Sequence, residues 1–365
     1  MPADVPRRIR LAILYGGRSA EHEVSVVSAR SMMAAIDREK YDVVPIAITK
    51  TGRWMLPART PDELPVEAGS LPGTGEEGTG VSLTHEAGGA ALTSPEGAAV
   101  GAGPIDVVFP VLHGPYGEDG TVQGMLELAG VAYVGAGVLA SALGMDKEMH
   151  KQLFRSRGLP VVPYIHVHAE DWRRSPDNVI ALAEDEIGVP CFTKPSSLGS
   201  SIGVTKCRTV EQVRAGLELA FSLDRKALVE RAVAGRELEC AVLGNDEPEA
   251  SVVGEILPSH EFYDFEAKYL EEGSELLIPA PVADQISEEI RRLAIEAFRA
   301  IDCAGMARVD FFYDEAAGSV LLNEINTIPG FTPISMYPKL WEASGVPYAK
   351  LIDRLIELAL ERRRG

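Results

Sequence analysis

The sequence predicts a mixed α/β (α+β) protein, and three observations support this fold class. An apolar run at residues 10–17 ends in Gly-Gly and precedes a segment with the apolar period of a helix, residues 23–36, so the chain opens with a β-loop-α unit. Strand and helix patterns then alternate between residues 178 and 233. Near the C-terminus, the alternating tracts RVDFFY and VLLNEIN flank the turn-like segment DEAAGS, which predicts a β-hairpin.

The first region extends to about Gly137. Its expected strands are residues 10–17, 41–50, 105–114 and 131–135, and its expected helices are residues 23–36 and 121–130. Between residues 57 and 103 the composition changes to Gly, Glu, Pro, Thr and Ala with little periodicity, which predicts an insertion of loops or a hairpin. We therefore expect an N-terminal domain at residues 1–137 that carries this Gly-rich insertion.

Two further domains are expected. A small central domain, residues 138–230, opens with a helical stretch that ends at Gly158 before two prolines. Its later elements are expected to be a helix at 178–188, a strand at 191–195, a strand at 202–207, a helix at 209–222 and a strand at 227–233. The last domain, residues 231–365, holds the remaining strands, a long loop at about 258–274, a helix at 285–301, the hairpin and a C-terminal helix.

The composition limits the class of partner. The chain has 365 residues, 46% of them apolar, which is enough for two or three domains with ordinary cores. Its net charge of −19 argues against a general nucleic-acid or anionic-membrane binder, because both partners attract basic surfaces. Any phosphate ligand must therefore be held by local cationic groups.

The cysteines and the apolar runs indicate a compartment. The four cysteines form no C-x-x-C pair, so neither a zinc site nor a disulfide framework is indicated: they are Cys191, Cys207, Cys240 and Cys303. The apolar run LAILY is too short for a signal peptide, and no other segment approaches a membrane span. We expect a cytoplasmic protein without a membrane partner.

The C-terminal hairpin predicts a metal site. Side chains alternate along a strand, so Arg308 and Asp310 share one face of their strand, as Glu324 and Asn326 do on theirs. A turn centred on Ala317 would place Asp310 opposite Glu324. Carboxylate and amide oxygens suit Mg²⁺, which proteins bind through one or two carboxylates plus substrate phosphates. The alternative is a solvated hairpin face with a surface salt bridge.

Two features predict a phosphate site. The loop KPSSLGSSIG between two expected strands allows Gly199, Ser200 and Ser201 to turn their backbone N–H groups inward as a phosphate cover. It is not a Walker A loop, because it lacks G-K-[ST] and opens no helix. Lys147 stands near the start of a helix, where the helix dipole disfavours a cation by about 0.3–1 kcal/mol and a ligand phosphate would offset that cost. An ordinary Gly/Ser turn and a solvated lysine are the alternatives.

Three glutamates and one histidine lie at the end of an expected strand, in the loop that follows it, or at the start of an expected helix. Glu230 and Glu237 are candidate acceptors for the amino group of a purine and the hydroxyls of a ribose. Glu23 suggests a carboxylate that meets an ammonium group, and capping of the helix dipole is its alternative. His113 is a candidate contact for a substrate carboxylate, although a lone histidine is often structural. Plain surface glutamates are the alternative for Glu230 and Glu237.

The long loop near residue 265 predicts a lid. Loops of this length in compact chains commonly close over active sites. Lys268 and Tyr269 are positioned within it to close over a phosphate. A disordered loop is the alternative, and the three aromatic residues of its segment 263–269 argue against it.

Together these residues resemble the ATP-grasp superfamily and, within it, the D-alanine:D-alanine ligases of peptidoglycan synthesis. The resemblance extends from Leu11 to about Leu358. Its motifs occur in the family's order, and they are GGRSAEHEVS, HGPYGEDG, GMDK, TKPSSLGSSIGV, VERAVAGRE, FYDFEAKY, ARVDFF and NEINTIPGFTPISMYP. It implies an ATP-grasp fold with an N-terminal Rossmann-like domain, and a homodimer.

The resemblance also implies roles in holding ATP and metal. ATP phosphates would be bound by Lys147, Lys194 and Lys268 and covered by the loop of Ser200 and Ser201. Adenine and ribose would be held by Glu230 and Glu237. Two Mg²⁺ ions, for which Mn²⁺ would substitute, would be bound by Asp310, Glu324 and Asn326.

For the substrates, the resemblance implies two D-alanine sites. Glu23 would hold the ammonium group of the first D-alanine, and His113 would lie near its carboxylate. Ser335 and the Met336 amide would receive the carboxylate of the second. Further implied roles are a hydrogen-bonded triad and an oxyanion site, formed by Glu23, Ser200 and Tyr269 and by Arg308 and the Gly330 N–H respectively.

The implied reaction forms D-alanyl-D-alanine through an acyl phosphate, with ADP and phosphate as the other products. Ligases that make the D-alanyl-D-lactate ester carry a histidine in a differently built lid, whereas this chain has Lys268-Tyr269, which favours the dipeptide. Two alternatives remain open. One is a catalytically silent ATP-binding protein, and the other is a different ATP-grasp carboxylate–amine ligase.

Overall fold

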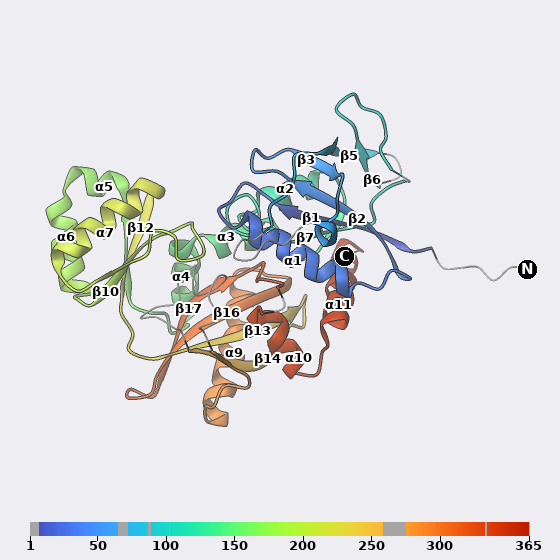
Figure 1. Ribbon diagram of the computed structural model, residues 1–365. Coiled ribbons are helices and arrows are strands. Elements are labelled where there is room, and N and C mark those ends of the chain that lie inside the picture. Colours follow the sequence, from blue (N-terminus) through green and yellow to red (C-terminus); the bar gives the residue numbers. More distant parts are fainter. Residues whose placement is uncertain are drawn as a thin grey trace, which may run out of the picture.

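A computed structural model describes residues 7–64, 72–86, 89–101, 103–257, 275–332 and 334–364 (Figure 1). Its strands form sheets of six, four and five strands and one two-stranded ribbon. In Figure 1 each of the larger sheets belongs to a separate lobe, and the lobes meet near α3 and α4. No helix within the described ranges is both long and apolar enough to cross a membrane.

The six-stranded sheet has the order β4-β3-β2-β1-β7-β8. Its strands are β1 (Ile9–Gly16), β2 (Tyr41–Ile48), β3 (Trp54–Pro57), β4 (Gly78–Gly80), β7 (Val107–Pro110) and β8 (Ala132–Tyr133). β2, β1, β7 and β8 are parallel, and β3 and β4 add an antiparallel edge. β1 is almost entirely buried because a parallel sheet is covered on both faces.

Alternate residues of β1 belong to two different cores. Leu11 and Ile13 pack with α1 (His22–Ala35) and the C-terminal helix α11 (Tyr348–Arg364). Ala12 and Leu14 pack with α2 (Thr121–Leu128) and the ribbon. The ribbon is a hairpin of β5 (Ser82–Glu86) and β6 (Gly89–Thr93), preceded by the 3-10 helix η1 (Pro61–Glu63). The Gly-rich segment therefore does contain the expected hairpin.

The junction with the central lobe contains two helices. The expected continuous helical stretch is interrupted at Asp146, whose backbone is extended at φ −92° and ψ 99°, so α3 (Val138–Met145) and α4 (Lys147–Ser156) are separate. The Asp146 side chain caps α4 by accepting a hydrogen bond from the Met149 N–H at 3.3 Å. The break places Lys147 at the first position of α4.

The central sheet is antiparallel, with the order β11-β10-β12-β9. Its strands are β9 (Tyr164–His168), β10 (Cys191–Pro195), β11 (Thr205–Cys207) and β12 (Lys226–Arg231). Three helices pack with the sheet through an apolar core: α5 (Ala169–Arg174), α6 (Pro176–Glu186) and α7 (Val210–Leu223). Val167 and Val229 face this core, so the residues that alternate with them face α4.

The third sheet is also antiparallel, with the order β15-β14-β13-β16-β17. Its strands are β13 (Arg236–Gly244), β14 (Glu249–Leu257), β15 (Glu275–Leu277), β16 (Gly305–Asp314) and β17 (Ser319–Asn326). Val309 and Phe311 pack against α9 (Asp284–Ala300), which leaves Arg308 and Asp310 on the opposite face. Helix α10 (Met336–Ala343) packs against β13 and β14, and α11 returns to the first sheet.

We call Arg308, Asp310, Glu324 and Asn326 the metal-type residues. At these residues the hairpin of β16 and β17 has the register that the sequence predicted. Asp310 pairs with Glu324, and Arg308 pairs with Asn326. Nearer the turn, however, Phe311 pairs with Leu322, so a β-bulge lies between the two parts of the ladder. Continued without the bulge, the register of the turn would place Asp310 opposite Asn323. The predicted pairing is therefore confirmed, and it depends on one extra residue in β17.

Candidate active site

A cavity of about 460 Å³ lies between the central sheet and the third sheet, a volume within the usual range for ligand sites. We call it the larger cavity. Its lining contains nine residues that the sequence singled out: Lys147, Lys194, Gly199, Ser200, Ser201, Glu230, Glu237, Asp310 and Glu324. The fold thus brings together the residues predicted for phosphate, nucleoside and metal, although they are spread over 178 positions of the sequence from 147 to 324.

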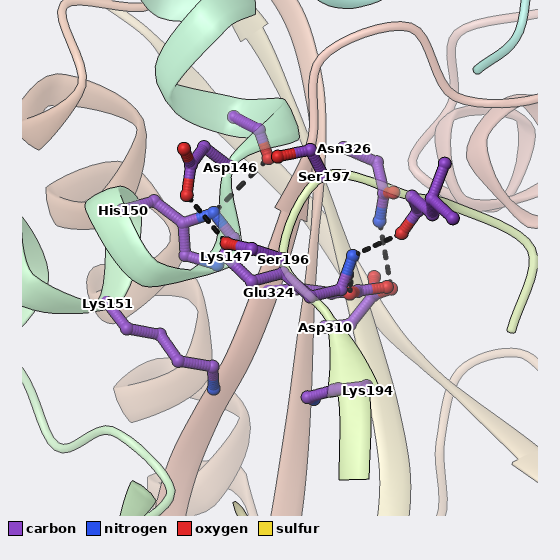
Figure 2. Close-up of polar contacts among 12 residues, drawn as sticks. Asp146, Lys147, His150, Lys151, Lys194, Ser196, Ser197, Asp310, Glu324 and Asn326 are labelled. Atoms are coloured by element: carbon purple, nitrogen blue, oxygen red, sulfur yellow. Dashed lines mark hydrogen bonds and ion pairs between the residues drawn. The ribbon is translucent and has the colours of Figure 1, made fainter. Parts of the chain in front are cut away.

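Lys147 connects α4 to the metal-type residues and to the loop at residues 194–203, which we call the phosphate loop. Its Nζ donates a hydrogen bond to the Leu198 carbonyl oxygen at 2.7 Å and lies 3.5 Å from Glu324 Oε2 (Figure 2). Its backbone N–H donates to the Ser196 carbonyl oxygen at 2.9 Å. The lysine is therefore anchored at both ends, with its charge directed into the larger cavity.

The phosphate loop adopts an uncommon backbone conformation. Ser200 and Ser201 have φ values of +49° and +59°, in the left-handed region that non-glycine residues rarely occupy. Such strain is found where the surrounding structure needs a particular backbone direction, as in loops that bind ligands. The inward direction of these backbone N–H groups stays a prediction.

Glu230 is buried between two lysines. Lys194 Nζ lies 2.5 Å from Glu230 Oε2, and Lys151 Nζ lies 3.2 Å from Oε1. Burial raises the pKa of Glu230, but the charges and hydrogen bonds of the two lysines lower it more, so the net shift is downward. Burial also lowers the pKa of Lys151 to about 8. Lys151 was not predicted, although its spacing of four from Lys147 places both on one helix face.

The metal-type residues form a connected group on the third sheet. Arg308 donates to both carboxylate oxygens of Asp310, at 2.7 Å each, and Asn326 Nδ2 donates to Asp310 Oδ2 at 3.0 Å. Arg308 Nε also lies 2.9 Å from Glu239 Oε2. Two carboxylates and an amide are all oxygen donors, which fits Mg²⁺ or Mn²⁺ and does not fit a thiolate metal.

A smaller cavity of about 90 Å³ adjoins the larger one, because Gly199, Ser200 and Glu324 line both. It contains predicted substrate contacts, namely His113, Arg308, Gly330, Ser335 and Met336. It also contains Glu21 and Glu118, which were not predicted. A ligand in the smaller cavity would therefore meet one in the larger cavity beside the metal-type residues.

The structure corrects the expected triad. The Ser200 hydroxyl donates a short hydrogen bond to the Glu21 carboxylate, whereas Glu23 Oε1 pairs with Lys50 Nζ at 2.5 Å. The expected contact of Glu23 with Ser200 is therefore wrong. Helix α1 begins at His22, and two residues separated by one position do not share a helix face, so only Glu21 points toward Ser200. The sequence could have indicated Glu21, because this residue occupies the N-cap position of α1.

Burial and nearby carboxylates shift the pKa of His113. Its ring is 4% exposed, and Nδ1 lies 3.8 Å from Glu118 Oε1. Burial lowers the pKa of His113, but Glu118 and then Glu21 raise it more, so the net shift is upward. An upward shift of the pKa favours the charged imidazolium, which suits the predicted contact with a substrate carboxylate.

The segment before α10 provides backbone N–H groups. Ser335 is the N-cap of this helix, and its Oγ accepts a hydrogen bond from the Thr332 N–H at 3.0 Å. The Met336 N–H lies in the first helical turn, where unpaired N–H groups and the helix dipole favour an anion. A side chain at Gly330 would place Cβ 2.8 Å from Ser335 Oγ, so glycine permits this close approach. Lys268 and Tyr269 lie outside the described residues.

Two facing antiparallel sheets with lysines on one side and a carboxylate–amide group on the other form the ATP-grasp fold of ATP-dependent ligases. The family model described as "D-ala D-ala ligase N-terminus" matches residues 10–136, and "D-ala D-ala ligase C-terminus" matches residues 153–357. The chain therefore belongs to the D-alanine–D-alanine ligase family.

Individual relatives agree with this assignment. A D-alanine–D-alanine ligase of Bacillus velezensis is 49% identical over 350 residues, which cover 96% of this chain and 97% of that protein. The solved D-alanine–D-alanine ligase of Coxiella burnetii is 37% identical, with a TM-score of 0.83 and coverage of 98% of this chain and 95% of that one. The VanG D-Ala:D-Ser ligase of Enterococcus faecalis is 34% identical, with a TM-score of 0.82 and coverage of 97% and 100%.

Proposed function

We propose that this protein joins two D-alanine molecules into D-alanyl-D-alanine for peptidoglycan precursor synthesis, with conversion of ATP to ADP and phosphate. The observation that carries the proposal is the junction of the two cavities at Ser200 and Glu324. It would place the terminal phosphate of a bound nucleotide beside a small substrate. The similarity to curated D-alanine–D-alanine ligases supports this substrate class.

The larger cavity would hold ATP. Lys147 and Lys194, with Lys268 of the loop outside the described residues, would neutralise the phosphates, and the backbone N–H groups at Ser200 and Ser201 would cover them. Glu230 and Glu237 would accept hydrogen bonds from adenine and ribose. Glu230 retains acceptor capacity beside its two lysines because a carboxylate offers about four lone-pair positions.

Asp310, Glu324 and Asn326 would hold two Mg²⁺ ions, for which Mn²⁺ would substitute. When bound, the ions would supply positive charge beside the phosphates. Asp310 accepts hydrogen bonds from Arg308 and Asn326, which would orient it for this role.

The smaller cavity would hold the amino acids. Glu21, rather than Glu23, would receive the ammonium group of the first D-alanine and orient Ser200. His113 would contact the first carboxylate, and Ser335 with the Met336 N–H would contact the second. We retain Tyr269 as a proposed third member of the group with Glu21 and Ser200.

The reaction would proceed in two displacements. A carboxylate oxygen of the first D-alanine attacks the γ-phosphorus, ADP leaves, and an acyl phosphate forms. The amine of the second D-alanine then attacks the acyl carbon, loses a proton and expels phosphate as the peptide bond forms. Arg308 and the Gly330 N–H, which line the smaller cavity, would donate to the oxyanion of the tetrahedral intermediate.

The similarity to the D-Ala:D-Ser ligase VanG gives D-serine as a second candidate acceptor. We also propose a cytoplasmic homodimer with three domains at residues 1–137, 138–230 and 231–365. The three larger sheets support the domain division, although α11 of the last range packs against the first sheet.

The first experiment measures phosphate release from ATP and Mg²⁺ with D-alanine alone, then with D-serine or D-lactate added, and identifies the product by mass. D-alanyl-D-alanine formed in step with phosphate is the expected result. The Glu324→Gln variant, which lacks a proposed metal ligand, is the matched control and should release little phosphate. Tight ATP binding without dipeptide would contradict the proposal and favour a silent relative, and a mixed product would identify the preferred acceptor.

A further inference from the structure

Two histidines and a glutamate meet at the edge of the central sheet. His166 and His168 are separated by one residue on β9, so both side chains lie on the face directed toward α4. Ile165 and Val167 lie on the other face, in the apolar core. Glu148 belongs to the first turn of α4 and faces the two histidines.

The distances leave space for an ion between these side chains. Glu148 Oε1 lies 3.7 Å from His166 Nε2 and 3.8 Å from His168 Nε2, and one ligand atom from each of the three residues lies within 4.8 Å of the others. These separations are too long for hydrogen bonds. Ligands of a tetrahedral Zn²⁺ at about 2.0–2.1 Å are about 3.3 Å apart, so small rotations of the side chains would complete the geometry.

The donor set is that of a transition-metal site. Imidazole nitrogens and a carboxylate oxygen suit Zn²⁺ and related divalent ions better than Mg²⁺, which prefers oxygen ligands alone. The two histidine side chains are 46% and 49% exposed, which gives an ion and a fourth, water ligand access from solvent. The cysteine spacing predicted no zinc site, whereas this arrangement contains no cysteine.

The glutamate is held in place by neighbours that are not ligands. Gln152 Nε2 donates to Glu148 Oε1 at 3.0 Å, and Lys226 Nζ lies 3.1 Å from Oε2. The Lys226 charge is shared with Asp146, so this group of two carboxylates and one ammonium has a net charge of about −1. Such partners orient metal-binding carboxylates. The glutamate is therefore fixed, and the exposed histidines are the groups that would adjust.

We propose that Glu148, His166 and His168 form a binding site for a divalent transition-metal ion, with Zn²⁺ as the best-fitting ion. This site is separate from the proposed Mg²⁺ site at Asp310, Glu324 and Asn326, which we call the catalytic metal group. None of the three new residues is among the described residues that line either cavity. A bound ion would join the first turn of α4 to β9. It would thereby reinforce the helix that presents Lys147, and the proposal does not depend on the identity of the substrate.

The test uses the full-length protein, freed of metal by a chelator and returned to excess Mg²⁺ so that the catalytic group is occupied. Isothermal titration with Zn²⁺ should show one site per chain. The double variant His166→Ala/His168→Ala should bind Zn²⁺ at least about tenfold more weakly. Loss of a residue that only orients a ligand already lowers metal affinity by about 10–100-fold. The melting temperature of the wild type, and not of this variant, should rise with Zn²⁺.

Two controls make the test specific. His85→Ala removes an exposed histidine on β5 and should leave Zn²⁺ affinity unchanged. Glu324→Gln alters the catalytic metal group and should also retain the Zn²⁺ site. Equal Zn²⁺ affinity in the wild type and the double histidine variant would overturn the proposal. So would loss of Zn²⁺ binding in Glu324→Gln with retention in the histidine variant.

Discussion

Glu21 links the first lobe to the central lobe through its hydrogen bond with Ser200. Glu21 is 6% exposed, and its carboxylate accepts a hydrogen bond from the Ser200 hydroxyl of the phosphate loop. Hydrogen bonds to charged groups contribute about 1.5–3 kcal/mol, against about 0.5–1.5 kcal/mol for neutral pairs. The side chain therefore couples the position of the phosphate loop to the smaller cavity.

We predict that Glu21→Gln lowers kcat/KM for D-alanine by about tenfold or more, since about 1.4 kcal/mol corresponds to a factor of ten. The matched control is Glu23→Gln, which weakens the ion pair with Lys50. That lysine is 65% exposed, and exposed pairs contribute about 0–1 kcal/mol, so a change within about twofold is expected. Steady-state kinetics of both variants test the assignment, and a larger loss in Glu23→Gln would restore the original expectation.

At the scale of elements, the break between α3 and α4 determines the position of Lys147, which is predicted to bind phosphate. Asp146 caps α4, accepts from Ser196 Oγ at 2.7 Å and pairs with Lys226 of β12. Burial raises the pKa of Asp146, but Lys226 and Ser196 lower it more, so the net shift is downward. One side chain thus starts the helix and joins it to the central sheet.

We predict that Asp146→Ala lowers the free energy of unfolding by about 2–4 kcal/mol at pH 7, from the lost cap and the lost charged hydrogen bonds. Asp146→Asn retains a good capping residue and should lose less. Because the folded pKa of Asp146 is lowered, its stabilisation is present above the unfolded pKa and is lost as the pH falls through the folded value. Urea unfolding at pH 7 and in acid tests this, and a penalty that grows in acid would contradict it.

The hairpin shows a second effect at this scale. Strand alternation fixes which residues of β16 and β17 share a face, but the bulge fixes which of them are opposite each other. Asp310 and Glu324 would otherwise be out of step by one position, and the Glu324 side chain would point to the other face. A local irregularity is therefore required for the metal-type group.

At the scale of the whole molecule, the C-terminal helix closes the chain onto its first sheet. Leu351, Ile352 and Leu355 of α11 share one buried core with Leu11 and Ile13 of β1. The same core includes residues of β13 and α10 from the third lobe. The first and last lobes are consequently joined by apolar packing that spans the full length of the chain.

We predict that Leu355→Ala, at a position with no exposure, lowers the free energy of unfolding by about 2–5 kcal/mol. Its KM values should change little, because Leu355 lines neither described cavity. The control is Leu219→Ala on α7, where the residue is 46% exposed and little loss is expected. Calorimetry measures both variants, and equal melting temperatures for the two would show that α11 is not part of the shared core.

The sequence by itself determined the elements and most of the residues that meet. Apolar periods located β1, α1, β10 and α9 closely, and strand alternation placed Arg308 with Asp310 and Glu324 with Asn326 on one face of their respective strands. These features follow from local geometry, which repeats every two residues in a strand and every 3.6 in a helix. Nine of the residues singled out in this way line the larger cavity.

Only the tertiary structure decided which of two neighbouring groups reaches a distant partner. It selected Glu21 over Glu23 for Ser200, paired Lys151 with Glu230, and brought His166 and His168 to Glu148. The Glu21–Ser200 pair is 179 positions apart, and the Lys151–Glu230 pair is 79 apart. Such contacts depend on how sheets and helices pack against each other, and local periodicity carries no information about that packing.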